Sequence, residues 1–150
     1  MLPSLQYLQE KGIQFREIHL SEVPKTAQDV ERIFGCPLRQ VLKSLLFIGR
    51  APVLAVLSGD RKVNKEKLAA SVGEATLRMA SPEEVLRHTG YPIGGVSPFG
   101  LPEGLRAVLD AVTLEQEKVN TGSGIAEIGI EISKEELKKV WTGIIADISL

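Results

Sequence analysis

A single lysine interrupts an apolar stretch of the chain. Residues 41–48 are apolar except for Lys43 and Ser44. Burying an ammonium is costly unless the group is paired or faces a ligand. Lys43 therefore either faces a cavity, where its charge would attract a phosphate or polarise an ester carbonyl, or lies on the outer face of an edge strand with its stem reaching water. The local pattern favours the two positions about equally.

A loop rich in glycine and proline, residues 94–100, is the second candidate site. Adjacent glycines let a backbone approach a ligand closely, and such a loop can aim N–H groups at an oxyanion or a phosphate. The alternative is a tight structural turn, which the glycine pair alone favours. Ser97 lacks the surroundings of a nucleophile elbow, because Phe99 stands where that motif has glycine. The candidate substrate contacts of this loop are Gly94, Gly95, Val96, Ser97, Pro98 and Phe99.

A second glycine-rich segment, residues 120–124, precedes a predicted strand. Its candidate contacts are Gly122, Ser123 and Gly124, whose N–H groups could also face an anion. A plain hairpin loop is the alternative. The segment is not a Walker loop, because no Lys-Ser or Lys-Thr pair follows the glycines.

Other residues with reactive side chains are weaker candidates for a functional site than Lys43 and the two loops. Asp60 lies in a turn, where an aspartate usually bonds to its own backbone, although it could orient Lys43 or a ribose hydroxyl. Two distant histidines and one cysteine give no metal-ligand spacing, so we expect neither a metal nor a cofactor. Cys36 is expected to be a small buried apolar residue rather than a nucleophile.

Composition limits the class of protein. The 150 residues suit one domain over 1–150. The net charge of -1, from 18 Lys and Arg against 19 Asp and Glu, does not predict a grip on a long stretch of nucleic acid. A basic cluster is either a solvated helix start or a contact to RNA phosphates. No signal peptide or membrane span is visible, which predicts a cytoplasmic protein. The cluster comprises Arg61, Lys62, Lys65 and Lys67.

The elements that must position these residues follow from periodicity and capping. Thr26, Asn64, Ser81 and Ser133 are predicted N-caps, and Ser81 and Ser133 each have glutamate three residues later. Because strands outnumber helices without strict alternation, we expect an α+β fold with a mixed, barrel-like sheet surrounded by helices. Strands are expected over 15–20, 41–48, 53–57, 75–79, 106–109, 126–132 and 144–148, and helices over 2–11, 27–34, 65–72, 82–89 and from 134.

In their order and spacing, these segments resemble the YbaK/ProX superfamily of tRNA-editing proteins. The resemblance covers nearly the whole chain. Members of this superfamily include domains that are inserted in prolyl-tRNA synthetase or act beside it. The matching segments are 26–29, 41–45, 58–63, 90–91, 94–100, Asp110, 122–124 and 146–148.

The resemblance implies a mixed, barrel-like fold and hydrolysis of the ester between an amino acid and the terminal adenosine of tRNA. It places the family's lysine at Lys43 and its substrate loops at 94–100 and 122–124, with Asp60 and Thr26 in matching segments. The implied partners are the tRNA acceptor end and prolyl-tRNA synthetase. The chain lacks the histidine that the alanine-specific branch carries near the second loop, which favours Cys-tRNA(Pro), with alanine, serine and threonine esters as alternatives. A non-catalytic RNA- or nucleotide-binding module and a regulatory synthetase subunit also stay open, as does the oligomeric state.

Overall fold

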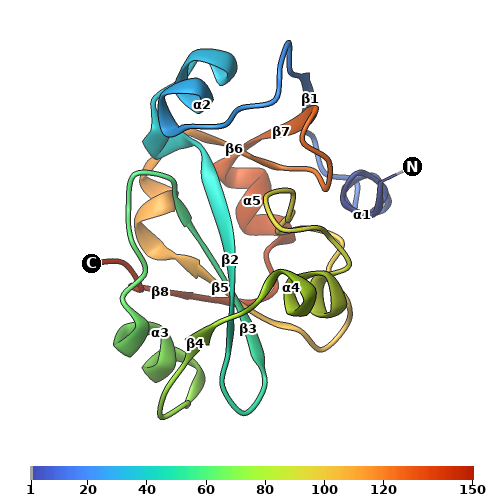
Figure 1. Cartoon of the computed structure of the whole chain (residues 1–150). Helices are drawn as coiled ribbons and strands as arrows, with labels where there is room; N and C mark the ends of the chain where they lie inside the picture. The colour runs from blue at the N-terminus through green and yellow to red at the C-terminus, as the bar shows by residue number, and fades with distance from the viewer. Residues whose placement is uncertain (1) are drawn as a thin grey trace.

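A computed structural model describes residues 2–150 and contains two β-sheets (Figure 1). The larger sheet has the strand order β4-β2-β3-β5-β8; β2 pairs antiparallel with β3 and β4, whereas β3, β5 and β8 run parallel. The smaller sheet is antiparallel, with the order β1-β7-β6. The strands are β1 (Arg16–His19), β2 (Leu42–Ile48), β3 (Pro52–Ser58), β4 (Arg78–Met79), β5 (Arg106–Asp110), β6 (Lys118–Gly122), β7 (Ile128–Ser133) and β8 (Ile144–Ala146).

The α+β class is confirmed, but the expectation of a barrel-like sheet is wrong. The larger sheet is open and ends in β4 and β8, which have only two and three residues. An isolated bridge between Val41 and Asn120 links the start of β2 to the smaller sheet. Because both faces of the larger sheet are covered by separate apolar clusters, the sheet need not close on itself to enclose a core.

Four helices begin where their capping residues predict. Thr26, Asn64, Ser81 and Ser133 each accept a hydrogen bond from the backbone N–H three residues later, and Ser81 forms a complete capping box with Glu84. These bonds satisfy N–H groups that the first helical turn leaves free. The α-helices are α1 (Pro3–Glu10), α2 (Ala27–Phe34), α3 (Lys65–Val72), α4 (Pro82–Thr89) and α5 (Lys134–Val140), and short 3-10 helices span Leu38–Gln40 (η1) and Ala111–Glu115 (η2).

Strand β3 lies at the centre of the core and is buried on both faces. Leu54 and Val56 pack into the cluster formed with α1, α4, α5 and the smaller sheet. Val53 and Ala55 point the other way, towards α3 and Ile148. The continuous apolar stretch at 53–57 is therefore explained by two packed faces rather than by alternation with solvent.

Strand β6 is the main difference from the expected elements. The segment 120–124 was expected to be a turn before a strand, yet its first three residues belong to β6 and pair with β7. Asn120 and Thr121 are buried there. Pairing with β7 satisfies backbone N–H and C=O groups of this segment. The local composition does not indicate this pairing.

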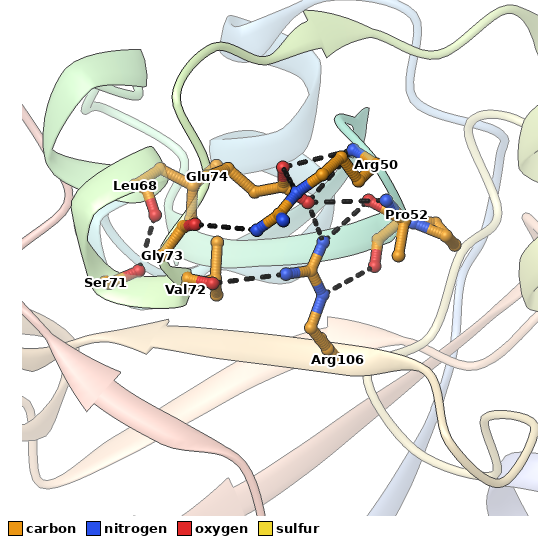
Figure 2. A network of polar contacts seen from close by, with 9 residues as sticks. Arg50, Pro52, Leu68, Ser71, Val72, Gly73, Glu74 and Arg106 are labelled. Atoms are coloured by element: carbon orange, nitrogen blue, oxygen red, sulfur yellow. Dashed lines mark hydrogen bonds and ion pairs between the residues drawn. The ribbon is translucent and has the colours of Figure 1, made fainter.

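A buried carboxylate ties the β2–β3 hairpin to α3 and β5 (Figure 2). The Glu74 side chain is only 3% exposed. It accepts hydrogen bonds from the backbone N–H groups of Arg50 and Ala51 and lies 2.8 Å from Arg106 Nη2. The Arg50 N–H first, and then the Arg106 guanidinium, lower the pKa of Glu74 to about 2.

We expect this carboxylate to make folding stability depend on acid pH. Because the folded pKa is below the ordinary value of 4.5, the contribution of Glu74 is fully present above pH 4.5 and is lost as the pH falls towards 2. Urea denaturation of the wild type and Glu74→Gln should show a difference in unfolding free energy that is largest near pH 7 and shrinks towards pH 2. The exposed Glu66 on α3 supplies the control, Glu66→Gln. A Glu74→Gln difference that stays constant with pH would contradict the assignment.

Candidate functional site

A cleft of about 670 Å³ opens where the first half of β2 meets α2, β6 and two glycine-containing loops. Strand β4 pairs with β2 only at Phe47 and Ile48, and the isolated bridge to Asn120 is at Val41, just before β2. Residues 41–45, between these two contacts, line the cleft. Six of the predicted site residues line the cleft: Lys43, Gly94, Gly95, Val96, Gly122 and Gly124.

Lys43 lies in the wall of this cleft. Its side chain is half-buried, and Nζ donates to the Gly59 carbonyl oxygen at 3.5 Å. Burial lowers the pKa of Lys43, the nearby Asp60 carboxylate opposes that shift, and Lys62 adds to it. Of the cleft-lining residues within 2–150, Lys43 alone is charged. The cleft therefore presents one partly desolvated cation to whatever enters it.

The two loops pack closely against each other, so their glycines leave little room for side chains. A Cβ on Gly95 would lie 3.2 Å from the Gly124 carbonyl oxygen, and one on Gly122 would lie 2.9 Å from the Val96 carbonyl oxygen. Gly124 has φ +114°, and a Cβ there would meet the Tyr91 ring at 2.7 Å. Close approach thus favours glycine at Gly122 and Gly124, the latter also through its positive φ, whereas a Cβ at Gly95 would need the Gly124 carbonyl to shift slightly.

Four predicted contacts from the two loops lie outside the cleft lining, and two of them support the loops from behind. Ser97 is fully buried and accepts the Phe99 N–H at 3.2 Å. Ser123 is also buried, and its Oγ donates to the Ile128 carbonyl at 2.6 Å. Pro98 and Phe99 instead line a separate cavity of about 770 Å³ near Trp141.

Thr26 and Asp60 border the site without lining the cleft. The Thr26 hydroxyl caps α2 by accepting the Asp29 N–H at 3.0 Å, and the next residue, Ala27, lines the cleft. Asp60 is exposed and acts on Lys43 through its charge. The structure therefore places both residues next to the site and leaves a direct substrate contact as a prediction.

An apolar wall of the same cleft was not predicted from the sequence. Helix α2 has no buried residue, and its apolar side chains line the cleft together with residues between β1 and α2, in the β6–β7 turn and at the start of β7. The spacing of Ala27, Val30 and Phe34 was the available signal, since positions three and four apart share a helix face. The wall consists of Leu20, Val23, Ala27, Val30, Phe34, Ile125, Ala126 and Ile128.

Cys36 and two members of the basic cluster have structural partners. The Asn120 side-chain amide donates to Cys36 Sγ at 3.3 Å, and burial raises the pKa of the thiol, so Cys36 is poorly suited to be a nucleophile. In the basic cluster, Lys67 pairs with Asp147 and Arg61 bonds to Ser149. Within residues 2–150, no group of three or more metal-binding side chains gathers, and no helix is long and apolar enough to cross a membrane.

Sequence comparison relates this chain to tRNA-editing proteins. Residues 22–140 match the family model of the aminoacyl-tRNA editing domain. The proline–tRNA ligase of Thermotoga maritima is 39% identical over 101 residues, which cover 64% of this chain but 17% of the ligase. The uncharacterized protein YwhH of Bacillus subtilis is 34% identical over 142 residues, 88% of this chain and 90% of YwhH. The chain thus spans less than a fifth of the ligase but nearly the whole of YwhH.

Solved structures share the fold over almost the whole chain. A protein described as a candidate trans-editing enzyme for prolyl tRNA synthetase superposes with a TM-score of 0.89 at 29% identity, covering 99% of this chain and 95% of that protein. The hypothetical protein APE2540 superposes with a TM-score of 0.91 at 26% identity, covering 99% of both chains.

Proposed function

Because this chain belongs to the aminoacyl-tRNA editing domain family, we propose that it hydrolyses the ester between a wrongly attached amino acid and the terminal adenosine of a tRNA. The observation that carries the proposal is the position of Lys43. Among residues 2–150, Lys43 is the one charged residue that lines the cleft, and two glycine loops form part of the cleft wall. A preorganised cation in such a cleft can stabilise the negative charge that develops on an ester carbonyl oxygen.

The proposed reaction needs no side-chain nucleophile. A positioned water, helped by a ribose hydroxyl, attacks the carbonyl carbon, and Lys43 stabilises the tetrahedral oxyanion or holds a phosphate. The C–O bond to the ribose then breaks, the ribose oxygen takes up a proton and the free amino acid leaves. The Gly95 N–H already donates to the Pro92 carbonyl at 3.0 Å, so any additional oxyanion donor comes from neighbouring N–H groups such as those of Gly94 and Gly124. No metal or cofactor takes part in this scheme.

The apolar wall favours a substrate amino acid with a small side chain that needs few hydrogen bonds. Burying a hydroxyl without a partner costs about 1–3 kcal/mol, and the Thr121 hydroxyl at the cleft already donates to the Gly122 carbonyl. A thiol loses less on transfer to such a wall, because it is a weak donor and acceptor. We therefore propose Cys-tRNA(Pro) as the leading substrate, with alanine, serine and threonine esters as alternatives.

We further propose that the tRNA acceptor end is the partner and that the reaction takes place in the cytoplasm. A net charge of -1 suits contact with one end of a tRNA rather than with its whole length. A prolyl-tRNA synthetase that delivers the mischarged tRNA would supply the remaining affinity.

Hydrolysis of a panel of mischarged tRNAs tests the proposal. We expect Cys-tRNA(Pro) to be hydrolysed fastest, Ala-, Ser- and Thr-tRNA more slowly, and correctly charged Pro-tRNA(Pro) least. One methylene in an apolar pocket typically changes specificity by about 10- to 200-fold, so differences of this size are expected between neighbouring substrates.

The same panel separates the competing functions. Tight tRNA binding without hydrolysis of any ester would identify a binding module. Co-purification with a synthetase, again without turnover, would identify a regulatory subunit. Either result would contradict the deacylase proposal.

A further inference from the structure

The Lys43 ammonium is held by a turn that packs tightly against the start of β2. The Gly59 carbonyl accepts from Nζ, and the Gly59 N–H donates to the Val41 carbonyl at 2.8 Å. A Cβ on Gly59 would lie 2.9 Å from Leu38 Cδ1 and 3.0 Å from the Val41 carbonyl oxygen. The position of this turn, residues 58–62, therefore decides where the Gly59 carbonyl and the Asp60 charge stand relative to Lys43.

Arg61 anchors the turn from its far side. Its Nε donates to Ser149 Oγ at 2.7 Å, and Nη2 donates to the Leu150 carbonyl at 3.4 Å. The same Nε lies 3.9 Å from Asp110 Oδ2. Arg61 thus connects the turn both to residues 149–150 and to the end of β5.

Asp110 is a deeply buried carboxylate with incomplete hydrogen bonding. It is 1% exposed, and its Oδ1 accepts the Ile148 N–H at 3.1 Å. Within residues 2–150, Oδ2 has no hydrogen-bond partner. A buried carboxylate is costly unless a cation compensates it, and the Arg61 guanidinium is the cation within 4 Å.

Residues 148–150 complete the connection. The Leu150 N–H donates to the Lys62 carbonyl at 2.9 Å, and the Asn64 N–H donates to the Ile148 carbonyl at 2.8 Å. The segment therefore runs beside the turn and is fastened to β5 by Asp110. Loss of the Arg61 side-chain contacts would leave the turn attached only through these backbone bonds and the bond from the Gly59 N–H to the Val41 carbonyl, which would loosen the turn beside Lys43.

We propose that Arg61 and Asp110 are positioning residues that fix the Lys43 ammonium in the cleft through the 58–62 turn. Neither residue lines the cleft, so neither is expected to touch the substrate. The inference rests on the proposed deacylase activity, and it adds a way in which residues outside the cleft set the rate. It also gives Arg61 a role other than contact with RNA phosphates.

Steady-state hydrolysis of Cys-tRNA(Pro) by Arg61→Met tests the proposal. Misplacing a reacting group by about 1 Å can cost up to a hundredfold in rate, so we expect kcat to fall roughly 10- to 100-fold while KM stays within about twofold. In the Lys43→Ala background, Arg61→Met should cause no further loss, because there is then no ammonium to position. Arg61→Lys should recover part of kcat, since an ammonium can still compensate Asp110.

Two further variants complete the design. Arg78→Met is the matched control: Arg78 forms a surface ion pair with Glu84 and lies opposite Ile48, at the other end of β2, so its kcat should not change. If Arg61→Met does not fold, Asp110→Asn keeps an acceptor for the Ile148 N–H, removes the charge and should show the same loss confined to kcat.

The outcomes distinguish this inference from the proposed function. Wild-type hydrolysis that Lys43→Ala abolishes would support the deacylase independently of Arg61. An unchanged kcat in Arg61→Met, a rise in KM alone, or a full additional loss in the Lys43→Ala background would then overturn the positioning role only. Absence of wild-type hydrolysis of every ester would overturn both.

Discussion

Lys43→Ala should lower kcat for ester hydrolysis by about two to three orders of magnitude, the usual cost of removing one preorganised oxyanion donor. The loss should be large because no other charged residue within 2–150 lines the cleft. Lys43→Met should lose activity to the same extent while keeping most of the volume of the side chain. Single-turnover hydrolysis of Cys-tRNA(Pro), with tRNA binding measured separately, checks the expectation.

Stability should not fall together with activity in Lys43→Met. Burial lowers the pKa of Lys43, which means that the fold disfavours the charged form relative to the unfolded chain. Removing that charge at pH 7 should therefore leave the unfolding free energy equal or slightly higher, as often happens when a functional charge is removed. Lys138→Ala, an exposed lysine on α5, is the control and should alter neither property. A Lys43→Met variant that retains wild-type kcat would refute the assigned role of the ammonium.

Gly124→Ala should damage both the fold and the site. A left-handed backbone costs an L-residue about 1–2 kcal/mol, and forcing a methyl group into the Tyr91 ring adds about 1–3 kcal/mol. We therefore expect a loss of about 2–5 kcal/mol in the urea-derived unfolding free energy. Because the Gly124 carbonyl packs on Gly95, displacement of one loop should move the other and lower kcat/KM at least about tenfold.

Gly104→Ala isolates the backbone contribution. Gly104 also has a positive φ, +87°, but a Cβ there would meet no atom within 4 Å, and the residue lies outside the cleft lining. This variant should lose only about 1–2 kcal/mol and keep its kcat/KM. Equal losses in the two variants would show that the contact between the loops and Tyr91 is unimportant.

The sequence by itself determined the local elements and the main candidate for chemistry. Each of the four N-cap side chains accepts a hydrogen bond from an N–H only three residues later, so these bonds could be inferred from residue types and spacing alone. The apolar stretch at 53–57 indicated a strand buried on both faces. A charged residue among apolar ones singled out Lys43 because an unpaired ammonium is too costly to bury without a reason. The order of the motifs indicated the editing family, which the comparisons confirm.

The tertiary structure alone decided which of these residues meet at the cleft. Lys43 could have pointed to solvent; instead it lines the cleft, which the start of β2 forms together with α2, β6 and the two glycine loops. Ser97 and Ser123 lie behind the loops because their hydroxyls satisfy backbone groups there. The open sheets, strand β6 and the Arg61–Asp110 contact all depend on partners far away in the chain. Helix caps and apolar helix faces depend on interactions between residues close in sequence, so residue types and spacing predict them. The features named above depend on long-range strand pairing and packing, which local spacing does not determine.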